Sequence, residues 1–210
     1  LMKNDSSSIS SPTSDSLSGH LLVATPQMTD PRFKRAVIFI CQHDTKAAMG
    51  LVINKPNTDL SFKKLAEHLN LDQSCLDSEE PVYTGGPVEP QRGYILHTDD
   101  QMLPETIPIA NGICLSLHVD MVSEISRGLG PSFAKVMLGY AGWSAGQLEH
   151  EMRENMWVHL PATTDILFKT NINDLWDKSF ARIGLNPATL SSTAGTVSYT
   201  HLTLPTIAEV

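Results

Sequence analysis

The stretch AVIFICQHDTKAAMGLVIN, residues 36–54, decides the fold. Two short apolar runs rich in β-branched residues, 36–41 and 49–54, stand on either side of a polar segment. Such runs, bounded by polar residues, are typical of buried strands. The sequence therefore predicts two paired strands joined by a turn.

Four amphipathic segments further along the chain predict helices that lay one face on this sheet. Gly128 and Gly130 stand where the second helix would end, and Gly184 stands where the fourth would end. Strands and helices do not alternate strictly, which argues against a doubly wound parallel sheet. The pattern predicts an α+β fold. The inward-facing residues are expected to be Phe62, Leu65, Ala66 and Leu69; Val119, Val122, Ile125 and Leu129; Ala145, Leu148 and Met152; and Ile172, Leu175, Trp176, Phe180 and Ile183.

Length and composition fit one folded domain that does not bind DNA directly. The chain has 210 residues, of which 41% are hydrophobic and 18% charged, enough to bury a core. Fifteen basic residues stand against 23 acidic ones, for a net charge of −8. The densest basic group is only Arg32, Lys34 and Arg35. Phosphate backbones repel such a protein unless one face is basic, and no basic face can be identified.

The cysteines and the hydropathy indicate a cytoplasmic protein. Cys41, Cys75 and Cys114 are odd in number and form no C-x-x-C motif, so a reducing compartment is the simplest setting. No apolar run is long enough to span a bilayer, and the first residues lack the regions of a signal peptide. We expect a soluble protein without a membrane partner.

The two ends are expected to lie outside the fold. Residues 1–16 are Ser-rich and almost free of apolar side chains, so they predict a disordered lead-in. Residues 196–210, TVSYTHLTLPTIAEV, look like a non-native or disordered tail, although their strand character would also allow an added edge strand.

Gly142-Trp143-Ser144-Ala145-Gly146 permits two interpretations of one serine. It matches G-x-S-x-G, the nucleophile elbow of α/β-hydrolases, with an apolar run before it and a helical pattern after it. Alternatively, Ser144 with Gln147 fits the S-x-x-Q capping box of a helix. Capping is the favoured interpretation, because a hydrolase also needs an acid and a histidine after the nucleophile.

The histidines that follow Ser144 are poorly placed for a triad. His150 lies on the same predicted helix and would point along it. His159 follows too soon to leave room for a strand that carries the acid, and His201 lies in the tail. The hydrolase hypothesis therefore rests on one pentapeptide.

Three long segments resemble the YqgE/AlgH family of bacterial proteins. They are GHLLVATPQMTDPRFKRAVIFICQHDTKAAMGLVINKP (19–56), PVYTGGPVEPQRGYILHTDD (81–100) and MLGYAGWSAGQLEHEMRENMWVHLPA (137–162), and the likeness covers about residues 17–195. The resemblance implies a compact single domain with a curved, barrel-like mixed sheet flanked by about four helices. It implies no reaction, although members have been labelled transcriptional regulators. In similar proteins Gly often replaces Ser144, which suits a cap and excludes a nucleophile.

Two segments provide candidate binding residues. Gly85, Gly86 and Pro87 form a tight loop that could approach an anion, although a turn with positive φ at one glycine is the commoner cause. Trp143, Gln147 and Glu151 follow one face of the predicted helix after the GYAGW turn, where a groove or a satisfied polar seam would show the same spacing.

No metal or cofactor is expected. Cys41 and His43 could project to one side of a strand, with His20 or His97 as a third ligand. A structural zinc site normally shows two close ligand pairs, and here there is one. The sequence therefore predicts a non-enzymatic protein that binds a partner protein or small ligand and regulates indirectly if it regulates at all, with a Ser144 hydrolase as the alternative.

Overall fold

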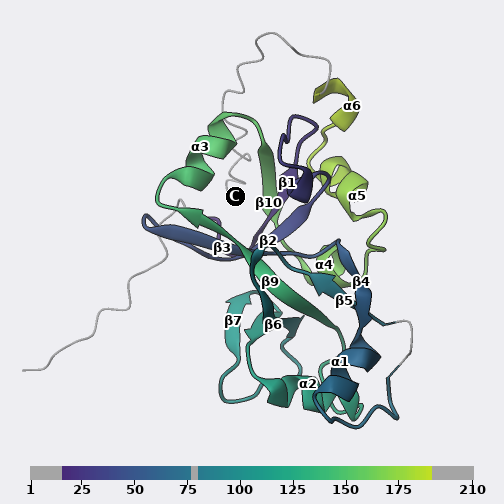
Figure 1. Cartoon of the computed structure of the whole chain (residues 1–210). Coiled ribbons are helices and arrows are strands. Elements are labelled where there is room, and N and C mark those ends of the chain that lie inside the picture. Colours follow the sequence, from purple (N-terminus) through teal and green to yellow (C-terminus); the bar gives the residue numbers. More distant parts are fainter. Residues whose placement is uncertain (1–15, 77–79, 191–210) are drawn as a thin grey trace, which may run out of the picture.

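The computed structural model describes residues 16–76 and 80–190, which contain ten strands and six α-helices (Figure 1). The strands are β1 (His20–Ala24), β2 (Val37–His43), β3 (Ala47–Val52), β4 (Pro56–Ser61), β5 (Pro81–Thr84), β6 (Val88–Thr98), β7 (Ile107–Ala110), β8 (Ile113–Ser116), β9 (Ala134–Ser144) and β10 (Trp157–Pro161). The helices are α1 (Phe62–His68), α2 (Val119–Ser126), α3 (Gln147–Arg153), α4 (Thr164–Phe168), α5 (Leu175–Arg182) and α6 (Pro187–Leu190), and a 3₁₀ turn covers Pro31–Phe33.

The predicted end segments fall almost wholly outside the described residues. Residues 1–15 and 196–210 lie there, so the disordered lead-in and the tail remain predictions. Ser16 is described, and its hydroxyl donates a hydrogen bond to the carbonyl oxygen of His43 at 3.0 Å. The part of the chain that contacts the fold therefore includes Ser16, one residue before the predicted domain boundary.

All ten strands join one curled, mixed sheet. Eight follow the order β10-β1-β2-β3-β9-β6-β8-β7, while β5 pairs with β9 and β4 pairs with β5. Among the described strands only β5 and β9 run parallel. The sheet curls until its two ends approach, since a β-carbon added to Gly19 before β1 would lie 3.1 Å from Ala110 Cβ on β7. The α+β class and the barrel-like sheet are confirmed.

The hairpin predicted from residues 36–54 is present as β2 and β3. Their register pairs Ile38 with Val52 and places a bulge between Ile40 and Gln42. The turn is shorter than predicted because β2 extends to His43. The Asp44 carboxylate closes it by accepting the backbone N–H groups of Lys46 and Ala47 at 2.7 and 3.0 Å.

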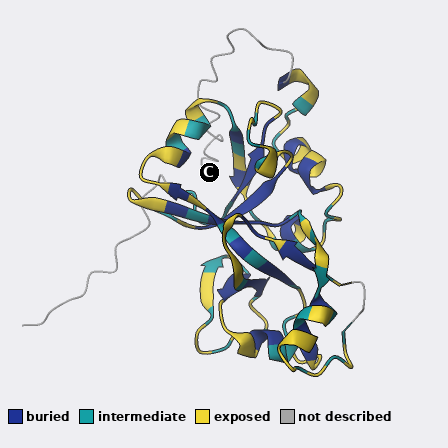
Figure 2. Cartoon of the chain, in the orientation of Figure 1, coloured by how far each residue is buried: buried dark blue, intermediate teal, exposed yellow. Residues whose placement is uncertain are grey.

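Apolar side chains form three clusters around the sheet. Figure 2 colours the buried residues along the strands and helices dark blue. The interior cluster fills the curl of the sheet and is closed by α4 and α5. The α3 cluster lies between the sheet and α3, and a third lies under α1 and α2. Their largest fully buried members include Phe39, Leu21 and Phe180; Leu22, Ile38 and Ile40; and Phe62 and Ile95.

The four predicted helices exist, and two short ones, α4 and α6, were not predicted. Several residues expected to face inward are exposed instead: Leu69, Val119 and Leu129 by 40%, 43% and 57%. Ala145 is exposed too and precedes α3. All four lie at or beyond a helix end, where the helical period no longer fixes the direction of the side chain. The remaining inward residues of the helices are buried or half-buried.

Two segments that are distant in sequence cross with their backbones in contact. A β-carbon on Gly86, at the end of the β5 loop, would lie 2.1 Å from the carbonyl carbon of Tyr140. On β9, Gly139 has φ +74°, and its β-carbon would lie 2.4 Å from the Gly86 oxygen. Close approach of two backbones therefore explains the glycines of the GGP loop better than an anion does. In the described part of the chain, no helix is long and apolar enough to cross a membrane.

Candidate functional site

Ser144 ends strand β9 and does not cap α3. The register pairs Ser144 with Ala47 of β3, and the N-cap residue is Gly146, with φ 74° and no side-chain capping bond. The predicted cap is therefore wrong, because a two-residue turn separates the strand from the helix. Half of the capping box still forms: Gln147 Oε1 accepts the Ser144 backbone N–H at 3.1 Å and its hydroxyl at 3.3 Å.

The described surroundings of Ser144 lack the features expected of a hydrolase site. Ser144 is absent from the four described non-glycine residues with positive φ, so it lacks the strained backbone of an elbow. Within the described chain, Gln147 is the side chain that hydrogen-bonds its hydroxyl. His150 lies exposed on α3, and His159 contacts His20. Among the described residues, therefore, no base lies in place to activate this serine.

We predict that Ser144→Ala changes the free energy of unfolding by no more than about 0.5 kcal/mol, because the side chain is exposed and lies away from the helix cap. Urea denaturation of both proteins measures the difference. A fluorophosphonate probe is expected to leave the wild-type chain unlabelled. Stoichiometric labelling that disappears in Ser144→Ala would contradict this prediction.

Glu151 joins the two tryptophans of the α3 cluster. Its Oε2 accepts the indole N–H of Trp143 and that of Trp157, both at 2.8 Å, and its Oε1 accepts Gln147 Nε2 at 3.2 Å. The indole rings pack edge to face with centroids 6.1 Å apart. A carboxylate with three donors is already satisfied. The polar seam is therefore the better description of this cluster, which locks α3 to β9 and β10.

The candidate residues from the two segments differ in accessibility. Gly85, Gly86 and Trp143 are buried, whereas Pro87 and Gln147 are exposed and Glu151 is half-buried. The backbone crossing at Gly86 and Tyr140 brings the two segments together. We call their accessible part the candidate face: it consists of Pro87, Val88, Gly142, Ser144 and Gln147, and all of these are exposed.

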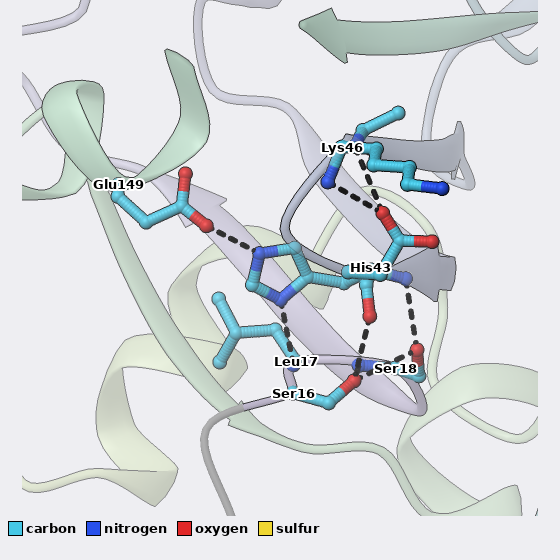
Figure 3. A network of polar contacts seen from close by, with 8 residues as sticks. Ser16, Leu17, Ser18, His43, Lys46 and Glu149 are labelled. Carbon is cyan, nitrogen blue, oxygen red and sulfur yellow. Dashed lines mark hydrogen bonds and ion pairs between the residues drawn. The ribbon is translucent and has the colours of Figure 1, made fainter. Parts of the chain in front are cut away.

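His43 anchors the first described residues to α3 (Figure 3). Its Nδ1 accepts the Leu17 backbone N–H at 2.9 Å, so the ring proton must lie on Nε2, which is 2.6 Å from Glu149 Oε1. This hydrogen bond holds the pKa of Glu149 below its usual value. Ser16 and Ser18 add bonds to the His43 backbone. Both ring nitrogens are occupied, which leaves none for a metal.

The Cys41 and His43 metal hypothesis is wrong for a second reason. The bulge between Ile40 and Gln42 turns the two side chains to opposite sides of the sheet. Cys41 packs in the interior cluster, where burial raises the pKa of its thiol to about 12, while His43 reaches α3. In the described residues, no group of three or more His, Cys, Asp or Glu could hold a metal ion.

A histidine and a serine are paired in the core. His97 Nδ1 lies 2.8 Å from the Thr98 carbonyl oxygen, which can only accept, so Nε2 is left to accept the Ser116 hydroxyl at 2.8 Å. The Ser116 oxygen in turn accepts a hydrogen bond from the Thr106 hydroxyl at 2.8 Å. The Thr106 oxygen accepts one from the Leu103 backbone N–H. His97 and Ser116 are 0% exposed, so no substrate reaches this pair.

Lys135 is a buried amine that sequence analysis did not single out. It is 7% exposed, donates a hydrogen bond to the Ile53 carbonyl oxygen at 3.3 Å, and stands 4.9 Å from the Tyr83 ring centroid. Burial lowers the pKa of Lys135 to about 8, and Glu80 opposes this shift. A lysine of this kind can serve as a nucleophile, but its burial denies it a substrate. The sequence signal for a buried lysine was the position of Lys135 within the apolar run that forms β9.

Two hollows lie elsewhere on the surface. One, of about 460 Å³, is polar and includes Asp100, whose pKa is lowered to about 2 by hydrogen bonds from Ser132 and Thr98. The other, of about 350 Å³, lies between α4 and α5. Neither is lined by a residue of the candidate face. The polar hollow is lined by Thr98, Asp99, Asp100, Asn111, Gly112, Ser132, Phe133, Thr164 and Lys169.

Comparison with known proteins decides the family. A family model described as AlgH-like matches residues 21–188, which include the hairpin, the crossing and α3. The chain belongs to the AlgH-like family. The likeness inferred from the three long segments is thereby confirmed.

Similar proteins of this AlgH-like family carry the name UPF0301 protein. One from Methylobacterium nodulans is 43% identical over 192 residues, covering 88% of this chain and 91% of the relative. One from a Bradyrhizobium species is 42% identical over 187 residues, covering 85% and 87%. The name states no substrate, ligand or partner.

Two solved structures share the fold. The solution structure of the AlgH protein from Pseudomonas aeruginosa is 36% identical with a TM-score of 0.69, covering 93% of this chain and 100% of that one. A crystal structure of a protein from Corynebacterium diphtheriae has a TM-score of 0.68 at 22% identity, covering 84% and 92%, and supports the fold alone.

Proposed function

We propose that this AlgH-like protein is non-enzymatic and binds a partner protein through the candidate face. The observation that carries the proposal is the state of two serines: Ser144 is exposed and no described base contacts its hydroxyl, whereas Ser116 has a base but is sealed in the core. Neither therefore combines activation with access, which covalent catalysis requires.

A partner protein suits this face better than a small ligand. Small-ligand sites are concave and enclose most of the ligand. The two hollows lie away from the candidate face, whose members are exposed strand and loop residues. The face is also rigid, because Glu151 fixes α3 through two indole bonds directly beneath it. A preformed surface loses little entropy on binding.

Charge supports a protein rather than a nucleic acid as the partner. The net charge of −8 repels phosphate, and α3 with its C-cap residue carries Glu149, Glu151 and Glu154 against Arg153. Any regulatory role would then be indirect. The three cysteines are all free, which supports a reducing cytoplasmic setting.

Site-specific photocrosslinking in cells tests the proposal. A benzophenone amino acid is introduced at Pro87 or Ser144 on the face, and at Lys64 or Glu67 on α1 as matched controls. All four positions are exposed, and α1 lies at the opposite end of the molecule from α3 (Figure 1). We expect a discrete adduct at the two face positions and none at the controls. Protease treatment should digest the crosslinked partner, whereas nuclease treatment should leave the adduct unchanged.

Three results would contradict the proposal. One is equal adducts at the face and on α1, which would indicate random collision. Another is adducts that nuclease removes, which would restore a nucleic-acid partner. The third is no adduct at either face position when the variants are folded and abundant.

A further inference from the structure

Two histidines face each other near one edge of the sheet. β10 is the edge strand and β1 is its neighbour; Leu22 of β1 pairs with His159 of β10, and His20 pairs with Pro161. Because residues two apart on a strand share a face, His20 projects to the same side as Leu22 and its partner His159. The two Nδ1 atoms lie 3.1 Å apart, and the ring centroids are 5.2 Å apart at an angle of 46°.

That separation matches the bite of a metal chelate. Two nitrogens bound at their usual length lie roughly 2.8–3.0 Å apart at cis positions of a square-planar site and roughly 3.3 Å apart in a tetrahedral one. The distance of 3.1 Å between the two Nδ1 atoms falls between these values. Without a metal, one Nδ1–H donates a hydrogen bond to the lone pair of the other Nδ1.

We propose that His20 and His159 form a two-imidazole site for a late first-row divalent cation, bound through both Nδ1 atoms. Cu²⁺ should bind tightest, since it stands at the top of the affinity order for such ligands. Solvent completes the coordination. The ring that carried Nδ1–H moves its proton to Nε2, so both rings stay neutral and no net proton is released.

The surroundings favour this binding state. The backbone is fixed on both sides: Ala162 N–H donates to Gly19 O at 3.0 Å, and Gly19 N–H donates to Ile40 O at 2.8 Å. Ligands on paired strands are better positioned than ligands on loops.

The site is separate from the earlier metal hypothesis and from the proposed function. It shares His20 with that hypothesis, but its second ligand is 139 positions away in the chain. None of the residues of the candidate face takes part in it. Protein binding and metal binding can therefore be tested independently.

Titration of the untagged full chain with Cu²⁺, followed by electron paramagnetic resonance, tests the proposal. We expect one saturable equivalent, with hyperfine splitting from directly bound imidazole nitrogens. His20→Ala and His159→Ala should each weaken binding by about tenfold or more. His150→Ala is the matched control, because it removes an exposed histidine outside the pair and should leave the affinity unchanged.

His20 is half-buried and His159 is exposed, so the variants are expected to fold, and circular dichroism checks this. His159→Asn provides a second variant that keeps a polar side chain on β10. The proposal is overturned if the wild-type chain shows no saturable binding. It is equally overturned if the folded His20 and His159 variants keep the wild-type affinity, or if His150→Ala loses as much.

Discussion

Gly86→Ala is expected to destabilise the protein by at least about 4 kcal/mol, a large part of the roughly 5–15 kcal/mol that stabilises a typical folded domain. The added β-carbon would lie 2.1, 2.2 and 2.4 Å from the Tyr140 carbonyl carbon, the Tyr140 oxygen and the Ala141 nitrogen. These are backbone atoms of β9, which pairs with β3, β5 and β6. The clash therefore cannot be relieved by rotation of one side chain.

Gly93→Ala is the matched control for this prediction. Gly93 lies on β6, next to the same strand, and an added β-carbon would meet no atom within 4 Å. Its substitution should change the free energy of unfolding by less than about 1 kcal/mol, with stabilisation allowed through the unfolded state. Urea denaturation of the three proteins gives the comparison. Similar denaturation midpoints for the two variants would contradict the close approach of Gly86 to the Tyr140 backbone.

The sequence predicts those parts of the fold that depend on local periodicity. The alternation of apolar and polar runs locates β2 and β3, and the 3.6-residue period locates α5 with Trp176 and Phe180 inward. The same period misplaces Val119 and Leu129, because it does not indicate where α2 begins and ends. Periodicity specifies the interior of an element and leaves its ends to capping and tertiary contacts.

The Ser144 cap failed for a related reason. Ser-x-x-Gln is the correct spacing, and Gln147 does bond back to Ser144, but the left-handed turn at Gly146 separates the serine hydroxyl from the helix N-terminus. Gly146 occupies the second x of Ser-x-x-Gln, and a glycine there indicates that a left-handed turn can form between the serine and the helix. Local spacing alone does not distinguish a cap from a residue two positions before it.

Other groupings have no local signal. Ser116 and His97 are 19 residues apart and meet because β6 and β8 pair in one register. Trp143 and Trp157 come from two strands, and Glu151 bonds both only after α3 packs between them. Sheet topology creates such contacts, so a single sequence offers the residues without their pairing.

His97→Gln is expected to cost about 2–4 kcal/mol at pH 7.5 and to weaken the pH dependence of stability. His97 is the fully buried end of a chain that runs from Leu103 through Thr106 and Ser116. A side chain of different shape leaves buried hydroxyl or carbonyl groups without a partner, at about 1–3 kcal/mol each. Chemical denaturation measures the loss.

The sign of the pH effect follows from the direction of the pKa shift. Burial lowers the pKa of His97 in the folded protein, against weaker raising by the Thr98 bond and by Asp100. In the unfolded chain the pKa has its ordinary value of 6.5. Above that pH both states are neutral and the stabilising contribution is complete. As the pH falls below 6.5, the unfolded chain binds the proton first, and stability is lost until the folded pKa is passed.

Denaturation of the wild-type chain from pH 8 to about pH 5.5 should therefore show a falling free energy of unfolding in the lower half of that range. His20 and His159 have lowered pKa values too and add to the fall, so His97→Gln should reduce the slope without abolishing it. His68→Gln is the control: this histidine is exposed on α1, and its loss should leave the slope unchanged. An unchanged slope in His97→Gln would mean that His97 binds its proton equally well in both states, which its burial and its bond to Ser116 argue against.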